Sequence, residues 1–145
     1  MKIWFDMDGT IANLYDVENW LNKLISENPS PYLEAKPLIN MNKLAKLLNK
    51  IQKKGIEIGI ISWLSKNSTD EYDKKVTSAK LTWLNTHLKS VNWNYIKIVP
   101  YGTNKYELCE SGYLFDDEEK NRIDWKDKAY EPNKIFEVLT ALGKN

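Results

Sequence analysis

The stretch Ile3-Trp4-Phe5-Asp6-Met7-Asp8-Gly9-Thr10 decides the fold of this chain. Three apolar residues are followed at once by two carboxylates, a glycine and a threonine, which is typical of a short buried strand that ends in a polar turn. Glycine permits the left-handed backbone that a tight turn requires. We therefore predict a buried first strand over residues 3–5, with functional groups directly after it.

Outward from this stretch, the hydrophobic pattern alternates between the helix period and the strand period. Apolar residues three and four apart predict amphipathic helices, and short β-branched or aromatic runs predict strands. The predicted helices cover 16–28, 41–54, 70–88 and the chain after Pro132, and the further strands cover 56–61, 95–99, 113–115 and, at an edge, 129–130. Residues 101–112 are predicted to be mostly loop, and the highly charged residues 118–128 to be a solvated loop. This alternation indicates an α/β fold with a mainly parallel sheet flanked by helices, in one domain over 1–145.

The composition limits the classes of function. The chain has 145 residues with 21 basic and 20 acidic side chains, so no strong overall charge favours nucleic acid or an anionic membrane. The only cysteine is Cys109 and the only histidine is His87, which excludes an intrachain disulfide, a multi-cysteine metal site and any site with two imidazoles. The first residues lack a signal-peptide pattern, and no apolar run reaches the length of a transmembrane helix. We expect a cytoplasmic protein with no membrane partner.

Polar residues follow the predicted strands, and in open α/β sheets functional groups gather beyond the carboxyl ends of the strands. In chain order these residues are Asp6 and Asp8, Ser62 and Trp63, Lys105, and Asp116 and Asp117. Gathered carboxylates repel one another unless a cation neutralises them, and Mg²⁺ takes oxygen ligands and commonly binds substrate phosphate as well. A hydroxyl and an ammonium can hold a phosphate while a carboxylate acts as the nucleophile. The set therefore predicts Mg²⁺-dependent phosphoryl transfer, with Lys66 as the alternative to Lys105.

The segment Asp6-Met7-Asp8-Gly9-Thr10 resembles the DxDGT motif of the haloacid dehalogenase (HAD) superfamily. Ser62, Lys105 and the pair Asp116-Asp117 match the later motifs of that superfamily in order. Residues 7–13 and the paired aspartates look most like the 5′(3′)-deoxyribonucleotidase branch. The resemblance implies a Rossmann-like (HAD-type) core and a phosphomonoesterase that acts through an aspartyl-phosphate on nucleotide 5′- or 3′-monophosphates.

The resemblance also implies a role for each matching residue. Asp6 would attack the phosphorus, and Asp8 would protonate the leaving oxygen and then activate water. Mg²⁺ would be held by the carboxylate of Asp6, the main-chain carbonyl of Asp8 and Asp116, with Asp117 as a neighbouring acceptor or alternate ligand. The phosphate would be held by Thr10, Ser62, the backbone N–H of Trp63, and Lys105.

Residues 11–40 follow the first motif, where members of this superfamily carry an inserted cap that controls substrate choice. With only about thirty residues, they have room for one helix and a proline-rich return. Deoxyribonucleotidases generally carry a larger helical cap. A minimal cap predicts either an open site that admits a large or extended phosphate ester, or closure by the partner subunit of a homodimer.

Other functions compete with this interpretation. A phosphatase for nucleic-acid ends or for other small phosphate esters would use the same chemistry, and salt-dependent oligonucleotide binding would distinguish it. A receiver-like signalling module carries its phospho-accepting aspartate after the third strand, where this chain has Pro100-Tyr101. A non-catalytic binding protein would not need the intact pair Asp6 and Asp8. Trp63, next to Ser62, either stacks on a base or forms a wall of the pocket, and the alternative to both roles is plain packing in the core.

Overall fold

A computed structural model describes residues 1–144 of the chain as an α/β fold. The main sheet contains β1 (Lys2–Phe5), β4 (Glu57–Trp63), β5 (Tyr95–Val99), β6 (Tyr113–Phe115) and β7 (Ala129–Tyr130), and a separate pair contains β2 (Ala12–Asn13) and β3 (Lys36–Pro37). The helices are α1 (Trp20–Ile25), α2 (Ser30–Glu34), α3 (Met41–Gln52), α4 (Asp70–His87), α5 (Lys105–Cys109), α6 (Glu119–Asp124) and α7 (Ile135–Leu142), with 3-10 turns η1 (Leu14–Asp16) and η2 (Pro132–Lys134).

The main sheet is parallel throughout, and its strand order is β5-β4-β1-β6-β7. The chain builds from β1 through β4 to β5 on one side, and then crosses back to add β6 and β7 on the other side. The order therefore reverses between β1 and β6, and ligand sites of open α/β sheets lie beyond the carboxyl ends of the strands at such a reversal. The predicted mainly parallel, Rossmann-like sheet is confirmed.

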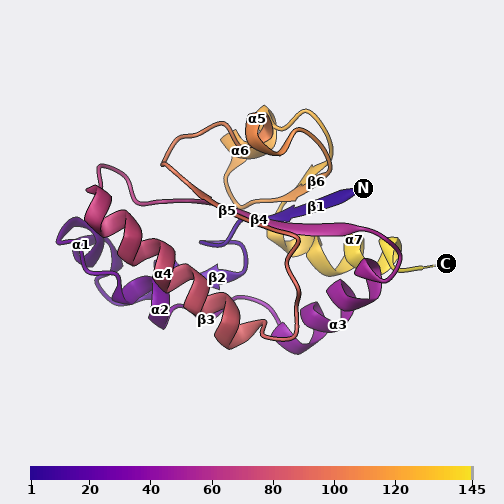
Figure 1. Ribbon diagram of the computed structural model, residues 1–145, viewed down its shortest axis with the longest axis horizontal. Helices are drawn as coiled ribbons and strands as arrows, with labels where there is room; N and C mark the ends of the chain where they lie inside the picture. The colour runs from indigo at the N-terminus through magenta and orange to yellow at the C-terminus, as the bar shows by residue number, and fades with distance from the viewer. Residues whose placement is uncertain (145) are drawn as a thin grey trace.

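Helices cover both faces of this sheet, as Figure 1 shows, with α5 and α6 on one side and α3, α4 and α7 on the other. The larger core cluster joins apolar residues of β1, β4 and β6 to the buried faces of α3, α4 and α7. The smaller cluster lies under α5 and α6 and includes Trp4, Leu114 and Trp125. Because both faces are covered, the strands are apolar on both sides, and few polar side chains other than those at their carboxyl ends lie inside the fold.

A glycine in β4 makes room for the large side chain of β1 on the α5 and α6 side. Gly59 pairs with Trp4 across the two strands. A Cβ at Gly59 would lie 2.5 Å from Cζ3 of the Trp4 ring, so any other residue would displace the indole. Because the Trp4 ring fits only against a residue without a side chain, this contact fixes the register of β1 on β4 and so the position of the residues that follow β1.

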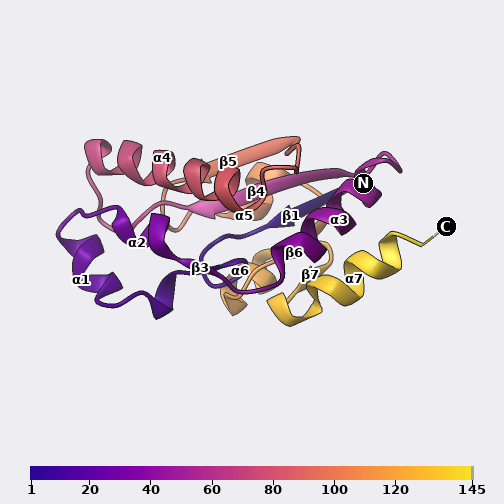
Figure 2. The same cartoon turned by 90° about the horizontal axis from the view of Figure 1, so that it is seen from below.

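Residues 11–40, which we call the cap segment, lie apart from the main sheet. The segment begins and ends in the antiparallel pair β2–β3, and between these strands it contains η1, α1 and α2. Its apolar side chains pack on α4 in a third cluster that includes Leu14, Tyr32 and Tyr72. Figures 1 and 2 both place α1 and α2 at one end of the molecule and the chain termini at the other.

Several predicted boundaries are wrong. The helix predicted over 16–28 is only α1, because Val17 is extended and Asn19 takes a left-handed φ of 56° before the helix begins. Residues 118–128, predicted as a solvated loop, contain α6. Residues 101–112 are mostly loop, as predicted, but they also contain the five-residue α5, which the Asn104 side chain caps. The strand predicted over 56–61 continues to Trp63 as β4, so Ser62 is the next-to-last residue of the strand and does not follow it.

The other predicted elements are present with shifts of a few residues at their ends. These are β1, α3, α4, β5, β6, β7 and α7. Across residues 1–144, none of the helices combines the length and the hydrophobicity that a membrane crossing requires.

Candidate active site

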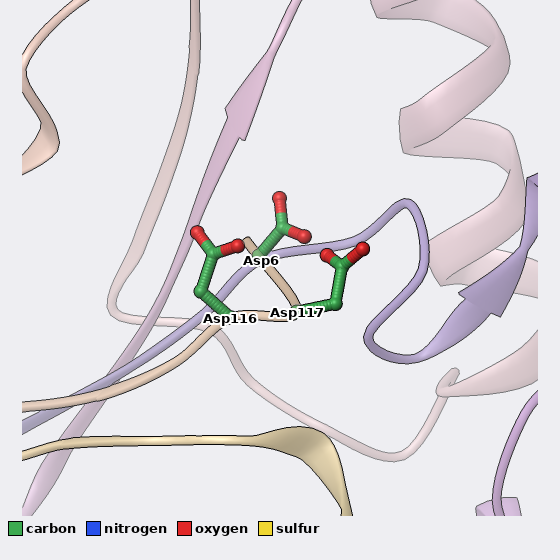
Figure 3. Close-up of side chains that lie close together, drawn as sticks. All are labelled: Asp6, Asp116 and Asp117. Atoms are coloured by element: carbon green, nitrogen blue, oxygen red, sulfur yellow. The ribbon is translucent and has the colours of Figure 1, made fainter. Parts of the chain in front are cut away.

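Three carboxylates meet at the point where the strand order of the sheet reverses. Asp6 follows β1, and Asp116 and Asp117 follow the neighbouring β6. The pairing of the two strands continues into the site, since the Asp6 N–H donates to the Phe115 carbonyl at 2.9 Å. Figure 3 shows the three side chains pointing into a common space. Parallel pairing therefore brings together side chains that lie more than a hundred positions apart in the sequence.

The turn after β1 places Thr10 beneath these carboxylates. The N–H groups of Thr10, Ile11 and Ala12 all donate to the Met7 carbonyl, which folds the chain tightly back. The buried Thr10 hydroxyl lies 2.9 Å from Asp6 Oδ2 and 3.2 Å from Asp117 Oδ1, and it also accepts from the Asp117 N–H. The structure thus gives this hydroxyl three protein partners, and a side-chain contact from Thr10 to phosphate stays a prediction.

Gly9 is required at this turn for two reasons. Its φ of 81° lies in the left-handed region, and a Cβ there would lie 2.3 Å from Asp117 Oδ2. Only glycine lets the turn approach the carboxylate so closely.

Lys105 lies inside the site, as the sequence predicts. It is the first residue of α5, its residue exposure is 3%, and its Nζ donates to Asp6 Oδ1 at 3.0 Å and to Asp116 Oδ2 at 2.7 Å. Burial disfavours the ammonium, but the two carboxylates outweigh burial and raise the pKa of Lys105 above its usual range. The alternative, Lys66, is exposed and lines the cavity described below. Lys105 is therefore the lysine that neutralises the carboxylate cluster.

A second buried lysine, Lys80 of α4, was missed by the sequence interpretation. Its residue exposure is 1%, and its Nζ donates to Asp8 Oδ2 at 2.9 Å, to Ser62 Oγ at 2.6 Å and to the Trp63 carbonyl at 2.7 Å. A signal for it exists in the sequence. Lys80 is four residues after Val76 and three before Trp83, so it falls on the apolar face of its helix. A lysine on a buried face needs an anionic partner there.

Ser62 and Trp63 end β4 beside these groups. Ser62 is fully buried, and its hydroxyl accepts from Lys80. The Trp63 indole is partly exposed, donates from Nε1 to the Thr103 carbonyl at 2.9 Å, and contacts Tyr101 with ring centroids 4.9 Å apart. Trp63 therefore forms part of the pocket wall, which is one of the two predicted roles.

Asp8 lies two residues beyond Asp6 and belongs with Lys80 rather than with the carboxylate cluster. Burial raises the pKa of Asp8 above its ordinary value; the Lys80 ammonium opposes this shift and the charge of Asp6 reinforces it. A carboxyl group that holds its proton more tightly than usual is suited to donate that proton to a leaving group.

Asp116 and Asp117 differ in their surroundings, although they are adjacent. Asp116 is fully buried and accepts from Lys105, from Asn121 Nδ2 at 3.1 Å and from the Glu118 N–H at 2.9 Å. Burial and the charge of Asp6 raise the pKa of Asp116 to about 6, and the same causes raise the pKa of Asp117 to about 8. Asn121, a further residue that the sequence interpretation missed, lies on α6 where a solvated loop was predicted.

The donor set fits a divalent cation. Asp6, Asp116 and Asp117 each offer a carboxylate oxygen, and these oxygens lie within 4.8 Å of one another. Burial, followed by the charge of Asp6, raises the pKa values of Asp116 and Asp117, and a bound cation would offset both effects. Oxygen ligands of this kind suit Mg²⁺. The Asp8 carboxylate is not in this group, so Asp8 would reach a cation there through its main chain, as the resemblance implies.

A cavity of about 740 Å³ opens over the site. Its floor includes Asp6, Asp8 and Lys105, and its walls are largely apolar. One wall comes from η1 and α1 and contains Leu14, Tyr15, Trp20, Leu21, Leu24 and Ile25. Trp63, Leu64 and Tyr101 line the cavity as well, together with the acidic residues Glu27 and Glu118 and the basic Lys66. The cap segment thus supplies one side of the cavity from within the same chain.

Comparison of the sequence with protein-family models and with curated proteins returned no match in either case. The geometry of the site is therefore what carries a functional proposal.

Proposed function

We propose that this chain is a Mg²⁺-dependent phosphomonoesterase of the HAD type, which acts through an aspartyl-phosphate on nucleotide 5′- or 3′-monophosphates. One observation carries the proposal. Asp6 and Asp8, two residues apart, are each held by a different buried lysine, Asp6 by Lys105 and Asp8 by Lys80. This arrangement separates a nucleophile from an acid: Lys105 places a positive charge beside Asp6 and the incoming phosphate, and Lys80 holds Asp8.

The first half-reaction joins Asp6 to the phosphorus. An oxygen of the Asp6 carboxylate attacks, the ester P–O bond breaks with its electron pair moving to the leaving oxygen, and Asp8 gives that oxygen its proton. The raised pKa of Asp8 supports this role. The Lys105 ammonium, 3.0 Å from Asp6 Oδ1, orients the Asp6 carboxylate and offsets the charge of the incoming phosphate.

The second half-reaction releases phosphate. Asp8, now ionised, takes a proton from a water molecule that attacks the phosphorus, and the bond between the Asp6 oxygen and phosphorus breaks. Lys80 stabilises the ionised Asp8 during this interval, since its Nζ lies 2.9 Å from Asp8 Oδ2. In this proposal the Ser62 hydroxyl and the Trp63 N–H, at the end of β4, hold phosphate oxygens, and Ser62, which is fully buried and bonded to Lys80, has to turn its hydroxyl toward the substrate.

The carboxylates of Asp6, Asp116 and Asp117 would hold Mg²⁺, which supplies charge neutralisation at the phosphate when it is bound. Asp117 has room for this role because, unlike Asp116, it has no lysine partner within hydrogen-bond distance among residues 1–144.

The cavity supports a substrate with one phosphate and a flat, largely apolar group. Its volume lies in the range of small-molecule sites, and its aromatic and aliphatic walls suit a nucleobase. Outside the carboxylate cluster the charged lining of the cavity is mixed, with Glu27 and Glu118 against Lys66, which supports a small monophosphate over a polyanionic nucleic-acid strand.

The proposal includes a cytoplasmic location. The single thiol, Cys109, is buried and has no second cysteine to pair with, which suits a reducing compartment. Closure of the site by a second copy in a homodimer remains the prediction made from the short cap.

Phosphate release is the decisive test. The chain with Mg²⁺ should hydrolyse p-nitrophenyl phosphate, and a panel of nucleoside 5′- and 3′-monophosphates, sugar phosphates and 3′-phosphorylated DNA should rank nucleotides first. Asp6→Asn should abolish turnover, whereas Asp16→Asn, at an exposed acid of η1, should not. Acid quenching of a reaction with ³²P-labelled substrate should trap label on the protein, and the label should be released by hydroxylamine.

Retained turnover in Asp6→Asn would rule out the mechanism. Binding of the same esters without any release of phosphate would favour a non-catalytic binding protein.

A further inference from the structure

The ammonium groups of both lysines in the site lie against aromatic rings. Lys80 Nζ is 5.0 Å from the centroid of the Tyr32 ring, and Lys105 Nζ is 5.2 Å from the centroid of the Trp63 ring. A cation over an aromatic face is attracted by the ring electrons, and the attraction is larger when the cation is desolvated. Both lysines are almost completely buried, so this condition is met at both.

Each ring is fixed in place by its own polar atom. The Tyr32 hydroxyl lies 2.5 Å from the Ser65 Oγ, and the Trp63 Nε1 donates to the Thr103 carbonyl. The two rings come from different parts of the fold, since Tyr32 belongs to α2 of the cap segment and Trp63 ends β4. A ring held at its edge keeps its face in a constant position over the cation.

The two rings that contact the lysines also belong to the wall of the open cavity. Tyr32 and Trp63 both line the cavity, whereas Lys80 does not. Lys80 uses all three of its N–H groups, on Asp8, Ser62 and the Trp63 carbonyl. Water that reached this ammonium would compete for those bonds, and the Tyr32 ring, which contacts the ammonium and lines the cavity, is the group that would keep such water away.

Lys105 differs in one respect. It donates to Asp6 and Asp116 and therefore has one N–H left, and unlike Lys80 it lines the cavity. The Trp63 face covers part of this ammonium and restricts the direction from which an acceptor can reach the third N–H.

We propose that Tyr32 and Trp63 are positioning residues, whose ring faces exclude water from Lys80 and Lys105 and hold each ammonium on its carboxylate. The consequence for catalysis rests on the proposed function; the exclusion of water from the lysines does not. Tyr32 gives the cap segment a role in the chemistry of the site in addition to substrate choice.

The first experiment measures lysine accessibility without substrate. Reductive methylation with formaldehyde and dimethylamine–borane, read by peptide mass spectrometry, should leave Lys80 and Lys105 almost unmodified in the wild-type chain. Tyr32→Leu should speed modification of Lys80 about tenfold or more and leave Lys105 protected. Trp63→Leu should speed modification of Lys105 by a similar factor and leave Lys80 protected. The Phe variants, which keep a ring face, should stay within about threefold of wild type.

Reciprocal protection separates a local effect from loss of folding, because an unfolded chain would expose both lysines. Should a Leu variant fail to fold, Tyr32→Met and Trp63→Met provide flexible apolar side chains without a ring. Phe136→Leu is the matched control, since it removes a ring 4.4 Å from the exposed Lys43 and should change neither site lysine.

The second experiment measures turnover of p-nitrophenyl phosphate. The Leu variants should lower kcat by about five- to thirtyfold, and the Phe variants should recover most of it. Equal lysine reactivity in the Leu and Phe variants would overturn the proposal. If the wild-type chain has no phosphatase activity, the proposed function fails, but the methylation pattern still decides whether the rings shield the lysines.

Discussion

Replacing Lys80 by methionine tests the buried ion pair that the sequence interpretation missed. The substitution keeps the length and apolar stem of the side chain but removes an ammonium that donates to Asp8, Ser62 and the Trp63 carbonyl. Removing one partner of a buried pair costs about 3–5 kcal/mol, because the other charge stays uncompensated. Asp8 keeps 16% side-chain exposure, so water can reach it, and the Ser62 hydroxyl can reorient. We therefore expect a loss of about 3 kcal/mol in the free energy of unfolding.

Urea unfolding followed by tryptophan fluorescence measures this loss, since the chain has 6 tryptophans. Lys75→Met, on the same helix, is the matched control. Lys75 pairs with Glu71 at 3.9 Å, but its side chain is 54% exposed, so this variant should lose no more than about 0.5 kcal/mol.

A double-mutant cycle with Asp8→Asn isolates the pair. The amide needs no cation, so Asp8→Asn should be less destabilising in the Lys80→Met background than in the wild-type chain, by about 1–3 kcal/mol. A loss below about 1 kcal/mol in Lys80→Met, or strict additivity in the cycle, would refute the assignment of a buried pair.

The remaining predictions concern the carboxylates, the tight turn and the thiol. Without Mg²⁺, the free energy of unfolding should fall as pH rises from about 4 toward 8. The reason is that burial and neighbouring carboxylates raise the pKa of Asp116 to about 6 and of Asp117 to about 8, so the folded chain binds protons more tightly than the unfolded chain. Added Mg²⁺ should raise the thermal midpoint more at pH 8 than at pH 5, and equal increases would contradict this. Gly9→Ala should lower the free energy of unfolding in urea clearly more than Gly55→Ala. Both glycines have a left-handed φ, which costs an alanine about 1–2 kcal/mol, but of the two only Gly9 has a neighbour, the Asp117 carboxylate, that a Cβ would strike. Equal losses would show that the Asp117 carboxylate moves freely. Cys109 should react slowly with DTNB at pH 8 in the native chain and quickly in urea, since burial raises the pKa of its thiol to about 11; fast native labelling would show that the thiol is accessible.

Much of the fold follows from local pattern in the sequence. The apolar runs that become β1, β5 and β6, and the helical periodicity of α3 and α4, depend on neighbours along the chain, so they are visible without any tertiary structure. The shorter α5 and α6 are not visible in this way. Both have few apolar residues of helical spacing. The Asn104 side chain caps α5, and Cys109 of α5 packs with Leu114 and Trp125, whereas α6 has no side-chain cap bond.

Part of the candidate site is likewise predictable from the sequence, and part is not. Asp6, Asp8, Asp116 and Asp117 follow strands, and the sequence alone places them at one edge because parallel strands end on the same side of a sheet. The sequence also predicts that Lys105 belongs with them. It does not determine which acceptors each ammonium meets.

Only the tertiary structure decided that a second lysine completes the site. Lys80 and Asp8 are separated by 72 positions, and their contact depends on how α4 packs across β4 and the cap segment. Local sequence sets the period of a helix and the residue at which a strand ends. Which side chains then share a buried volume is set by long-range packing, and in this chain that packing joins Lys80 to Asp8 and covers it with Tyr32.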